Sequence, residues 1–427
     1  MSIQDRPTSI SILQSMQSIS PPQYKNSILL GYLLENQTLP SISTLPIKVR
    51  RTKDWSRTTA LISPEDRISD LPHSILSHIL SFLPTDLAVR TSILSKRFNP
   101  VWLSITTFNM FDVYRKHLLH SAMLAMLSRD IALPILSFRL MCTFPEIAHD
   151  LIFEATKRGV QTIELDLMFS SLQMKTLSNQ HSCKTLTSLK LTSVTIKEDV
   201  PQIKLTFIKT LHLVDVIFKR PVQMINFFLG FSGLEELHTD LVYVISRMEF
   251  IPNPMVNCLP NLIRANISDI QLIPFFHLSR SLILNLNKIP LLNIVHLPDF
   301  YNLTQMEIVF KFEQTWNAKW KWILKILQQS PNLEHLIIHQ EIESENGMND
   351  NNWEDPRECV LSQLRTCLFR LWSGTECEIK FAEYIMRNSK VLSSMTIRCS
   401  SSISRKTKDE ILHKLSICPR DCKLIFG

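Results

Sequence analysis

The stretch Leu186-Thr-Ser-Leu-Lys-Leu191 has apolar residues at its first, fourth and sixth positions, and the stretch Ile208-Lys-Thr-Leu-His-Leu213 repeats this pattern. Nine full or partial copies follow one another along the chain, mostly at intervals of about 22 to 30 residues. A single copy often arises by chance, whereas an ordered series predicts stacked strands, each joined to the next by a returning segment or a short helix. The other copies are Ile135–Leu140, Val160–Leu165, Leu234–Leu237, Leu262–Ile267, Leu282–Leu284, Leu303–Ile308 and Leu333–Ile338.

The repeated pattern resembles irregular leucine-rich repeats over roughly residues 130 to 345. This resemblance implies a solenoid whose core is formed by the apolar residues of each copy. Residues between them, such as Lys190, His212, Glu235 and Glu307, would project from the concave strand face, where a ligand or partner protein would lie. The alternative is an unrelated α/β domain with alternating strands and helices.

Three short helices are predicted upstream of the repeats. Apolar residues recur at helical spacing between Pro72 and Pro84, which open and close the first helix. Thr85 and Asp86 are suited to cap the second. A third helix would start at Asn99-Pro100, with Asn as the cap and Pro at the first helical position. So short a segment cannot bury all its apolar surface alone, which predicts a docking module that completes its core on a partner.

This segment resembles the F-box, through Leu71-Pro72, Ser81-Phe-Leu-Pro84 and Leu94-Ser-Lys-Arg-Phe98. The resemblance implies docking on a Skp-type adaptor and, through it, on a cullin-RING ubiquitin ligase. Some of the implied anchors would also serve the module's own packing. Phe98 stands where the family usually has Trp, and Asn99-Pro100-Val101 replaces the more usual Arg-Asn-Leu. The implied adaptor-binding residues are Leu71, Pro72, Ile75, Leu76, Leu83 and Trp102.

The C-terminal part carries a second recognisable order of elements. An amphipathic helix with Phe381, Tyr384 and Ile385 is expected between two strand-like runs, and a second helix around Leu412 precedes the closing run Cys418–Phe426. This order resembles the FBD domain, which follows leucine-rich repeats in many plant F-box proteins. Because its strand-like runs keep the repeat pattern, we expect the FBD to cap the solenoid.

The predicted fold class is α/β: an all-α F-box of three helices, then an irregular leucine-rich-repeat solenoid capped by an α/β FBD region. The predicted boundaries are a disordered N-terminal extension over 1–64, the F-box over 65–110, repeats over 111–345, an acidic loop over 346–356 and the FBD over 357–427.

Composition narrows the class of protein. The net charge of +7 comes from 46 basic and 39 acidic residues with no dense basic stripe, so nucleic acid is not expected as a partner. Nine irregularly spaced cysteines indicate free thiols in a reducing compartment. We find neither a signal-peptide pattern nor an apolar run long enough to span a bilayer, so we expect a protein of the nucleus, the cytoplasm or both, without membrane association.

The sequence offers no catalytic or metal-binding pattern, and no catalytic residue, metal or cofactor is assigned. Only seven glycines occur, and none forms a phosphate-binding loop. His335 and His339 flank a predicted strand, where exposed or hydrogen-bonded histidines are more common than ligands. Cys418 and Cys422, near His413, lack an evident fourth zinc ligand.

Two functions fit these features. The first is a non-catalytic substrate-recognition subunit of an SCF-type E3 ubiquitin ligase, in which the repeats bind a target protein that the sequence does not identify. The second is a repeat-scaffold binding protein whose F-box no longer engages a ligase, an alternative that Phe98 and Asn99-Pro100 support.

Overall fold

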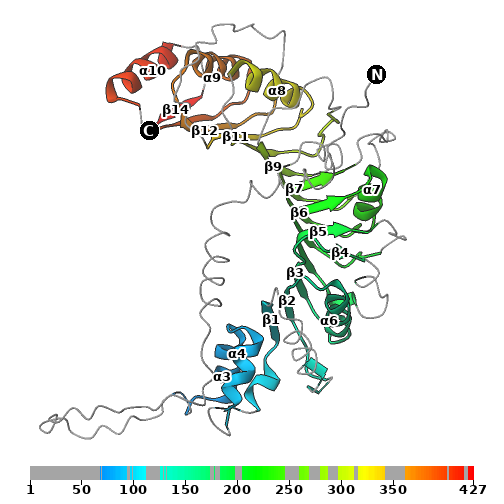
Figure 1. Ribbon diagram of the computed structural model, residues 1–427. Helices are drawn as coiled ribbons and strands as arrows, with labels where there is room; N and C mark the ends of the chain where they lie inside the picture. Colours follow the sequence, from blue (N-terminus) through cyan, green and yellow to red (C-terminus); the bar gives the residue numbers. More distant parts are fainter. Residues whose placement is uncertain are drawn as a thin grey trace, which may run out of the picture. The chain divides into compact units, whose positions relative to one another are not determined.

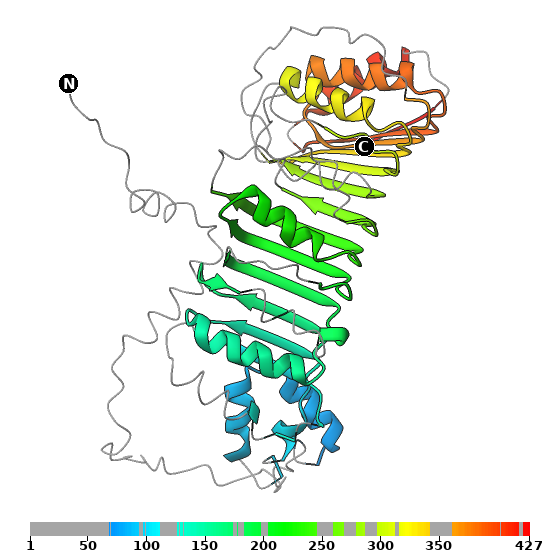
Figure 2. The same ribbon diagram turned by 90° about the vertical axis from the view of Figure 1, so that its right-hand side faces the viewer.

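A computed structural model of the 427-residue chain shows a sheet of 14 strands that lie side by side in chain order (Figures 1 and 2). It describes residues 68–111, 126–173, 177, 183–197, 204–245, 259–268, 279–286, 297–311, 316–341 and 361–427, without 69, 94–96, 99, 128, 131, 402 and 418–421. The predicted N-terminal extension, the acidic loop and Cys418 lie outside these residues.

All strand pairs are parallel, and each strand is followed in the sheet by the next one in sequence, except that the short β4 pairs only with β5. Every one of the nine sequence copies becomes a strand, so the predicted α/β solenoid is confirmed and the unrelated α/β domain is excluded. The strands are β1 (Thr107–Phe111), β2 (Ser137–Met141), β3 (Thr162–Asp166), β4 (Ser171–Leu172), β5 (Ser188–Ile196), β6 (Thr210–Phe218), β7 (Glu236–Val244), β8 (Arg264–Ile267), β9 (Ser281–Leu286), β10 (Gln305–Phe310), β11 (His335–Gln340), β12 (Thr366–Trp372), β13 (Ser394–Cys399) and β14 (Lys423–Phe426).

Register explains why the apolar pattern builds one core. Leu189 of β5 pairs with Leu211 of β6, and Leu191 pairs with Leu213, so the same template positions stack across the sheet. Side chains alternate between the two faces of a strand. Counted from the first residue of each strand, the second and fourth residues are buried in strand after strand. The first and third positions form the opposite face, which we call the strand face.

Helices cover the buried face of the sheet; for example, α6 lies beside β2 and β3 (Figure 1). Their buried residues join those of the strands in one core. Pro145 and Pro221 stand at the first turns of α6 and α7, where a missing backbone N–H costs nothing. These helices are α6 (Pro145–Lys157), α7 (Pro221–Leu229), α8 (Trp316–Gln328), α9 (Glu376–Asn388) and α10 (Arg405–Ile417).

The N-terminal helical module consists of α3 (His73–Ser81), α4 (Thr85–Arg90) and the 3-10 turns η1 (Thr91–Ile93) and η2 (Val101–Ser104). Its own core is small. The buried members of that core are Leu76, Leu80, Ala88, Val101 and Ile105.

One expected helix cap of this module was wrong, and one expected first-turn proline lies one position earlier than predicted. Thr85 is the first residue of α4 and does not cap it. Its hydroxyl instead accepts a hydrogen bond from the Asn109 backbone N–H (2.8 Å), because Thr85 is buried against β1. Pro100 precedes η2 instead of occupying its first position, and the proposed cap Asn99 lies outside the described residues.

The C-terminal region continues the solenoid without a break, as predicted. β12 pairs with β11, and β13 and β14 follow in the same register. The helix α9 packs on the last repeat helix, where the Trp320 ring lies 4.2 Å from that of Phe381 and 5.2 Å from that of Tyr384. The expected helices around Phe381 and Leu412 correspond to α9 and α10.

A buried polar network lies at the start of α9. Thr375 and Glu378 form a capping box, in which the Glu378 carboxylate accepts from the Thr375 backbone N–H (2.8 Å). The Glu378 side chain is buried near the equally buried Lys319 of α8. Burial raises the pKa of Glu378 to about 7, although its hydrogen bonds and Lys319 act in the opposite direction.

We therefore predict that stability falls as the pH rises from about 4.5 to about 7, since in this window the folded chain keeps a proton on Glu378 that the unfolded chain has lost. The total loss should be about 3 kcal/mol. Glu378→Gln should flatten this dependence in denaturant unfolding, whereas Glu376→Gln, an exposed change in the same turn, should not. An unaltered pH profile in Glu378→Gln would contradict the assignment.

Deletion of residues 357–427 should uncover the apolar end of the last repeat, including Trp320, because α9 and β12 no longer cover it. We expect aggregation on size-exclusion chromatography with light scattering. A truncated chain that stays monomeric and unfolds at an unchanged midpoint would instead make the C-terminal region an independent domain.

Candidate binding surfaces

The helical module exposes a row of large apolar side chains. Ile75, Ile79 and Phe82, which we call the α3 patch, are 45%, 44% and 72% exposed. Their spacing of four and three residues places them on one face of α3, while Leu76 and Leu80 face the module's core. Ile68 and Leu87 are also exposed. Exposed apolar side chains clustered on so small a module are typical of an interaction surface.

The residues expected to bind an adaptor are placed differently from one another. Pro72 and Ile75 are exposed. Leu71, Leu83 and Trp102 are half-buried and pack against the module's core. Leu76 is only 1% exposed and lies in the module's own core, a role that the sequence left open for some of these residues.

Ile79 and Phe82 were not among the binding residues predicted from the sequence, although both are exposed. The signal was present in their helical spacing from Ile75, which sets them on the face that Leu76 does not occupy.

The module is joined to the first strands by buried polar contacts. Besides the bond between Thr85 and Asn109, the Arg129 guanidinium donates to the Ile105 carbonyl (2.6 Å) and lies over the Phe108 ring. Burial and the nearby Arg158 lower the pKa of Arg129 to about 10. These side chains therefore supply hydrogen-bond partners for the Asn109 N–H and the Ile105 carbonyl, where the chain enters the sheet.

The strand face has charged and apolar parts. Along the row of third strand positions, Arg139 donates two hydrogen bonds to Glu164 (2.8 and 2.9 Å). Further along, Glu307 pairs with Arg370 (3.0 Å) from two strands away. The sequence placed Lys190, His212 and Glu307 correctly on this face, while Glu235 lies just before β7 and pairs with Lys209 (2.6 Å). Apolar residues of the same row are Ile283, Ile337 and Leu368.

A cavity of about 190 Å³ opens on this face over β6 to β9. Its floor includes His212 and His238, which are paired in register and have ring centroids 5.4 Å apart. Burial lowers the pKa of both imidazoles, and repulsion from His238 and Lys190 lowers that of His212 further. The sequence analysis missed His238, although it holds the same position in its repeat as His212.

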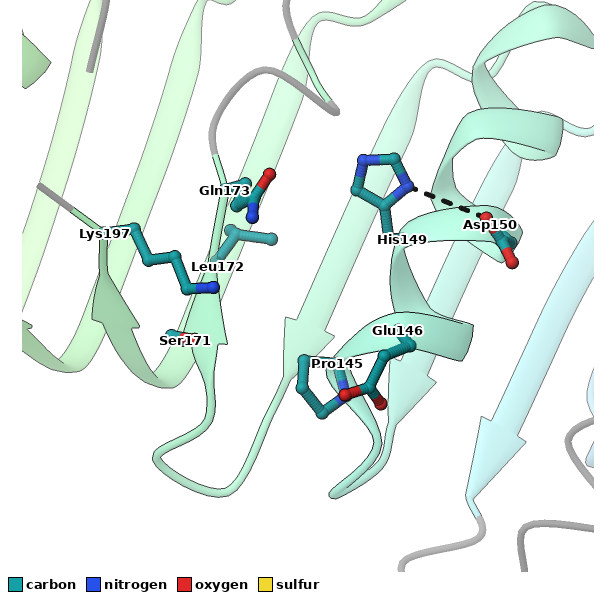
Figure 3. A pocket seen from close by; sticks show the side chains of 8 residues that line it. All are labelled: Pro145, Glu146, His149, Asp150, Ser171, Leu172, Gln173 and Lys197. Atoms are coloured by element: carbon teal, nitrogen blue, oxygen red, sulfur yellow. Dashed lines mark ion pairs between the residues drawn. The ribbon is translucent and has the colours of Figure 1, made fainter. Parts of the chain in front are cut away.

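A second cavity, of about 320 Å³, lies between the start of α6 and β4 (Figure 3). His149 and Asp150, 3.7 Å apart, line one side, and Lys197 lines the other. These three side chains are exposed, so water screens their charges and no group is held in a low-dielectric environment.

We searched the described residues for metal-ligand groups and for activated cysteine nucleophiles. No group of three or more His, Cys, Asp or Glu among them is arranged to hold a metal ion. Burial raises the pKa of the Cys142 and Cys367 thiols, the opposite of what a nucleophile needs. In the same part of the chain, no helix is both long and apolar enough to cross a membrane.

Comparison with known proteins matches two segments of the chain to domain families. Residues 68–107 match the F-box domain family, and residues 352–397 match the FBD family. The chain thus carries the two domains that give F-box/FBD/leucine-rich-repeat proteins their name. Two F-box/FBD/LRR-repeat proteins of Arabidopsis thaliana are 27% and 28% identical to it, over 86% of this chain in both cases and over 94% and 97% of the relatives.

Among solved structures, an internalin of Listeria monocytogenes is similar with a TM-score of 0.34 and 15% identity, over 77% of this chain and 76% of that protein. The F-box match covers the whole helical module from α3 to η2, and the FBD match covers β12, α9 and most of β13.

The buried bond between Thr85 and Asn109 predicts a selective response to substitution. Thr85→Val should cost about 1–3 kcal/mol of stability, because it leaves the Asn109 N–H without an acceptor. Thr85→Ser retains the hydroxyl and should lose less. Denaturant unfolding of both variants is the measurement, and equal stability of Thr85→Val and the wild type would contradict the role given to this bond.

Proposed function

We propose that this F-box protein is a non-catalytic substrate-recognition subunit of an SCF-type ubiquitin ligase. In this proposal the F-box docks on a Skp-type adaptor and the strand face of the repeats holds a target protein. The conjugating machinery supplies the chemistry, and this chain raises the local concentration of the target's lysines.

The observation that carries the proposal is the α3 patch. A module with five buried core residues leaves Ile75, Ile79 and Phe82 exposed on one helix face. Complete burial of a fully exposed apolar side chain stabilises a complex by roughly 1.5–3 kcal/mol. Because Ile75 and Ile79 are 45% and 44% exposed in the free chain, each would contribute about half of that. The F-box match over residues 68–107 supports a Skp-type adaptor as that partner.

The double variant Ile79→Ala/Phe82→Ala should weaken adaptor binding at least about thirtyfold, which corresponds to about 2 kcal/mol. Affinity can be measured by calorimetry between the full-length chain and the adaptor. Leu229→Ala/Ile417→Ala is a matched control, since it removes two exposed apolar side chains from α7 and α10.

Wild-type affinity in the α3-patch variant would contradict the proposed docking surface. Leu80→Ala distinguishes loss of folding from loss of the docking surface. Leu80 is buried, so its truncation should lower the stability of the module by about 2–5 kcal/mol. A wild-type chain that binds no adaptor would favour the alternative, a repeat scaffold outside any ligase.

A further inference from the structure

The cavity over β6 to β9 has the size of a side-chain site. Its volume of about 190 Å³ is below the roughly 300–1,000 Å³ of most small-molecule sites. It opens on the strand face, beside Ile283. A single side chain of a bound protein therefore fits it better than a whole metabolite.

The polar side chains in the partly apolar lining of this cavity include several hydrogen-bond donors. Within the described chain, the ring nitrogens of His212 and His238 bond to no other residue. The Asn266 carbonyl oxygen accepts from the Asn285 amide, which leaves the Asn266 N–H groups directed to other acceptors. Ser281 adds a hydroxyl. The one acidic lining residue, Glu236, is already paired with Arg264.

The charges around the histidines act in both directions. Lys190 of β5 lowers the pKa of both imidazoles, and Lys311 beyond β10 lowers that of His238. Glu164 of β3 raises the pKa of His212, and Asp240 of β7 raises that of His238. Asp166 and Asp215 lie toward the other end of the strands. Burial is the largest influence, so both imidazoles are mainly neutral near pH 7 and can gain a proton when an anion binds.

We propose that this cavity binds the carboxylate of a Glu or Asp side chain of the target protein, and that neighbouring apolar side chains of the target lie on Ile283, Ile337 and Leu368. The inference rests on the proposed function, because it takes the strand face to be the target-binding surface. A bound carboxylate favours the imidazolium form, so binding takes up a proton and tightens as the pH falls from about 7.5 to about 6.

The test uses the full-length chain with ¹³C-labelled histidine and three acetylated, amidated pentapeptides, Ser-Glu-Leu-Leu-Ser and its Gln and Lys counterparts. His212→Gln and His238→Gln assign the two ring resonances. His335, on the same face in β11 and bonded to Thr366 (2.8 Å), is an internal control, and His335→Gln is the matched variant.

We expect the Glu peptide to shift both resonances, to raise their pKa values and to bind roughly tenfold more tightly than the Gln peptide, as for a hydrogen bond to a charged group. The advantage should shrink at about pH 7.5 and vanish in His212→Gln/His238→Gln, but persist in His335→Gln. Equal affinity of the Glu and Gln peptides, tighter binding of the Lys peptide, or an equal response of His335 would overturn the proposal.

Adaptor binding, measured on the same preparations, reports on the proposed function independently. Adaptor binding without a preference for Glu rejects only the carboxylate site. The preference without adaptor binding rejects only the ligase role.

Discussion

Parallel strand pairing in constant register is the interaction on which the structure depends. Each strand of the main series hydrogen-bonds to its neighbour at equivalent positions, as Leu189 does with Leu211, so a residue's place in the repeat fixes the face on which it lies. A slip of one residue would turn every apolar template residue toward solvent. The cost of such a slip rises with every strand added, and the series runs from β1 through β14.

The same constraint builds the candidate target surface. Because the third residues of neighbouring strands are paired, the side chain of each lies next to that of the third residue in the following strand. Arg139 and Glu164 neutralise each other in this way, and His212 meets His238. The row thus passes from a charged, donor-rich part to an apolar part, a gradient that suits a target segment with an acidic residue next to apolar ones.

The F-box obeys a different constraint, that of insufficient size. Its core is too small to bury all the apolar side chains of α3. Leu76 on one face of the helix lies in the core, whereas Ile79 and Phe82 remain exposed. The bond from Asn109 to Thr85 and the contacts of Arg129 connect this module to β1. The F-box and the first strands are therefore joined by side-chain hydrogen bonds as well as by the chain itself.

The sequence by itself determined the strands, the order of F-box, repeats and FBD, and the outward direction of Lys190 and Glu307, because hydrophobic periodicity is a local property. The exposed row of α3 could also have been read from helical spacing. Only the tertiary structure decided that Thr85 bonds to Asn109, that Lys319 and Glu378 are buried together, and that Asn285 orients the Asn266 amide. Those contacts join residues from different elements, and they depend on how loops of unequal length bring those elements together, which no local pattern encodes.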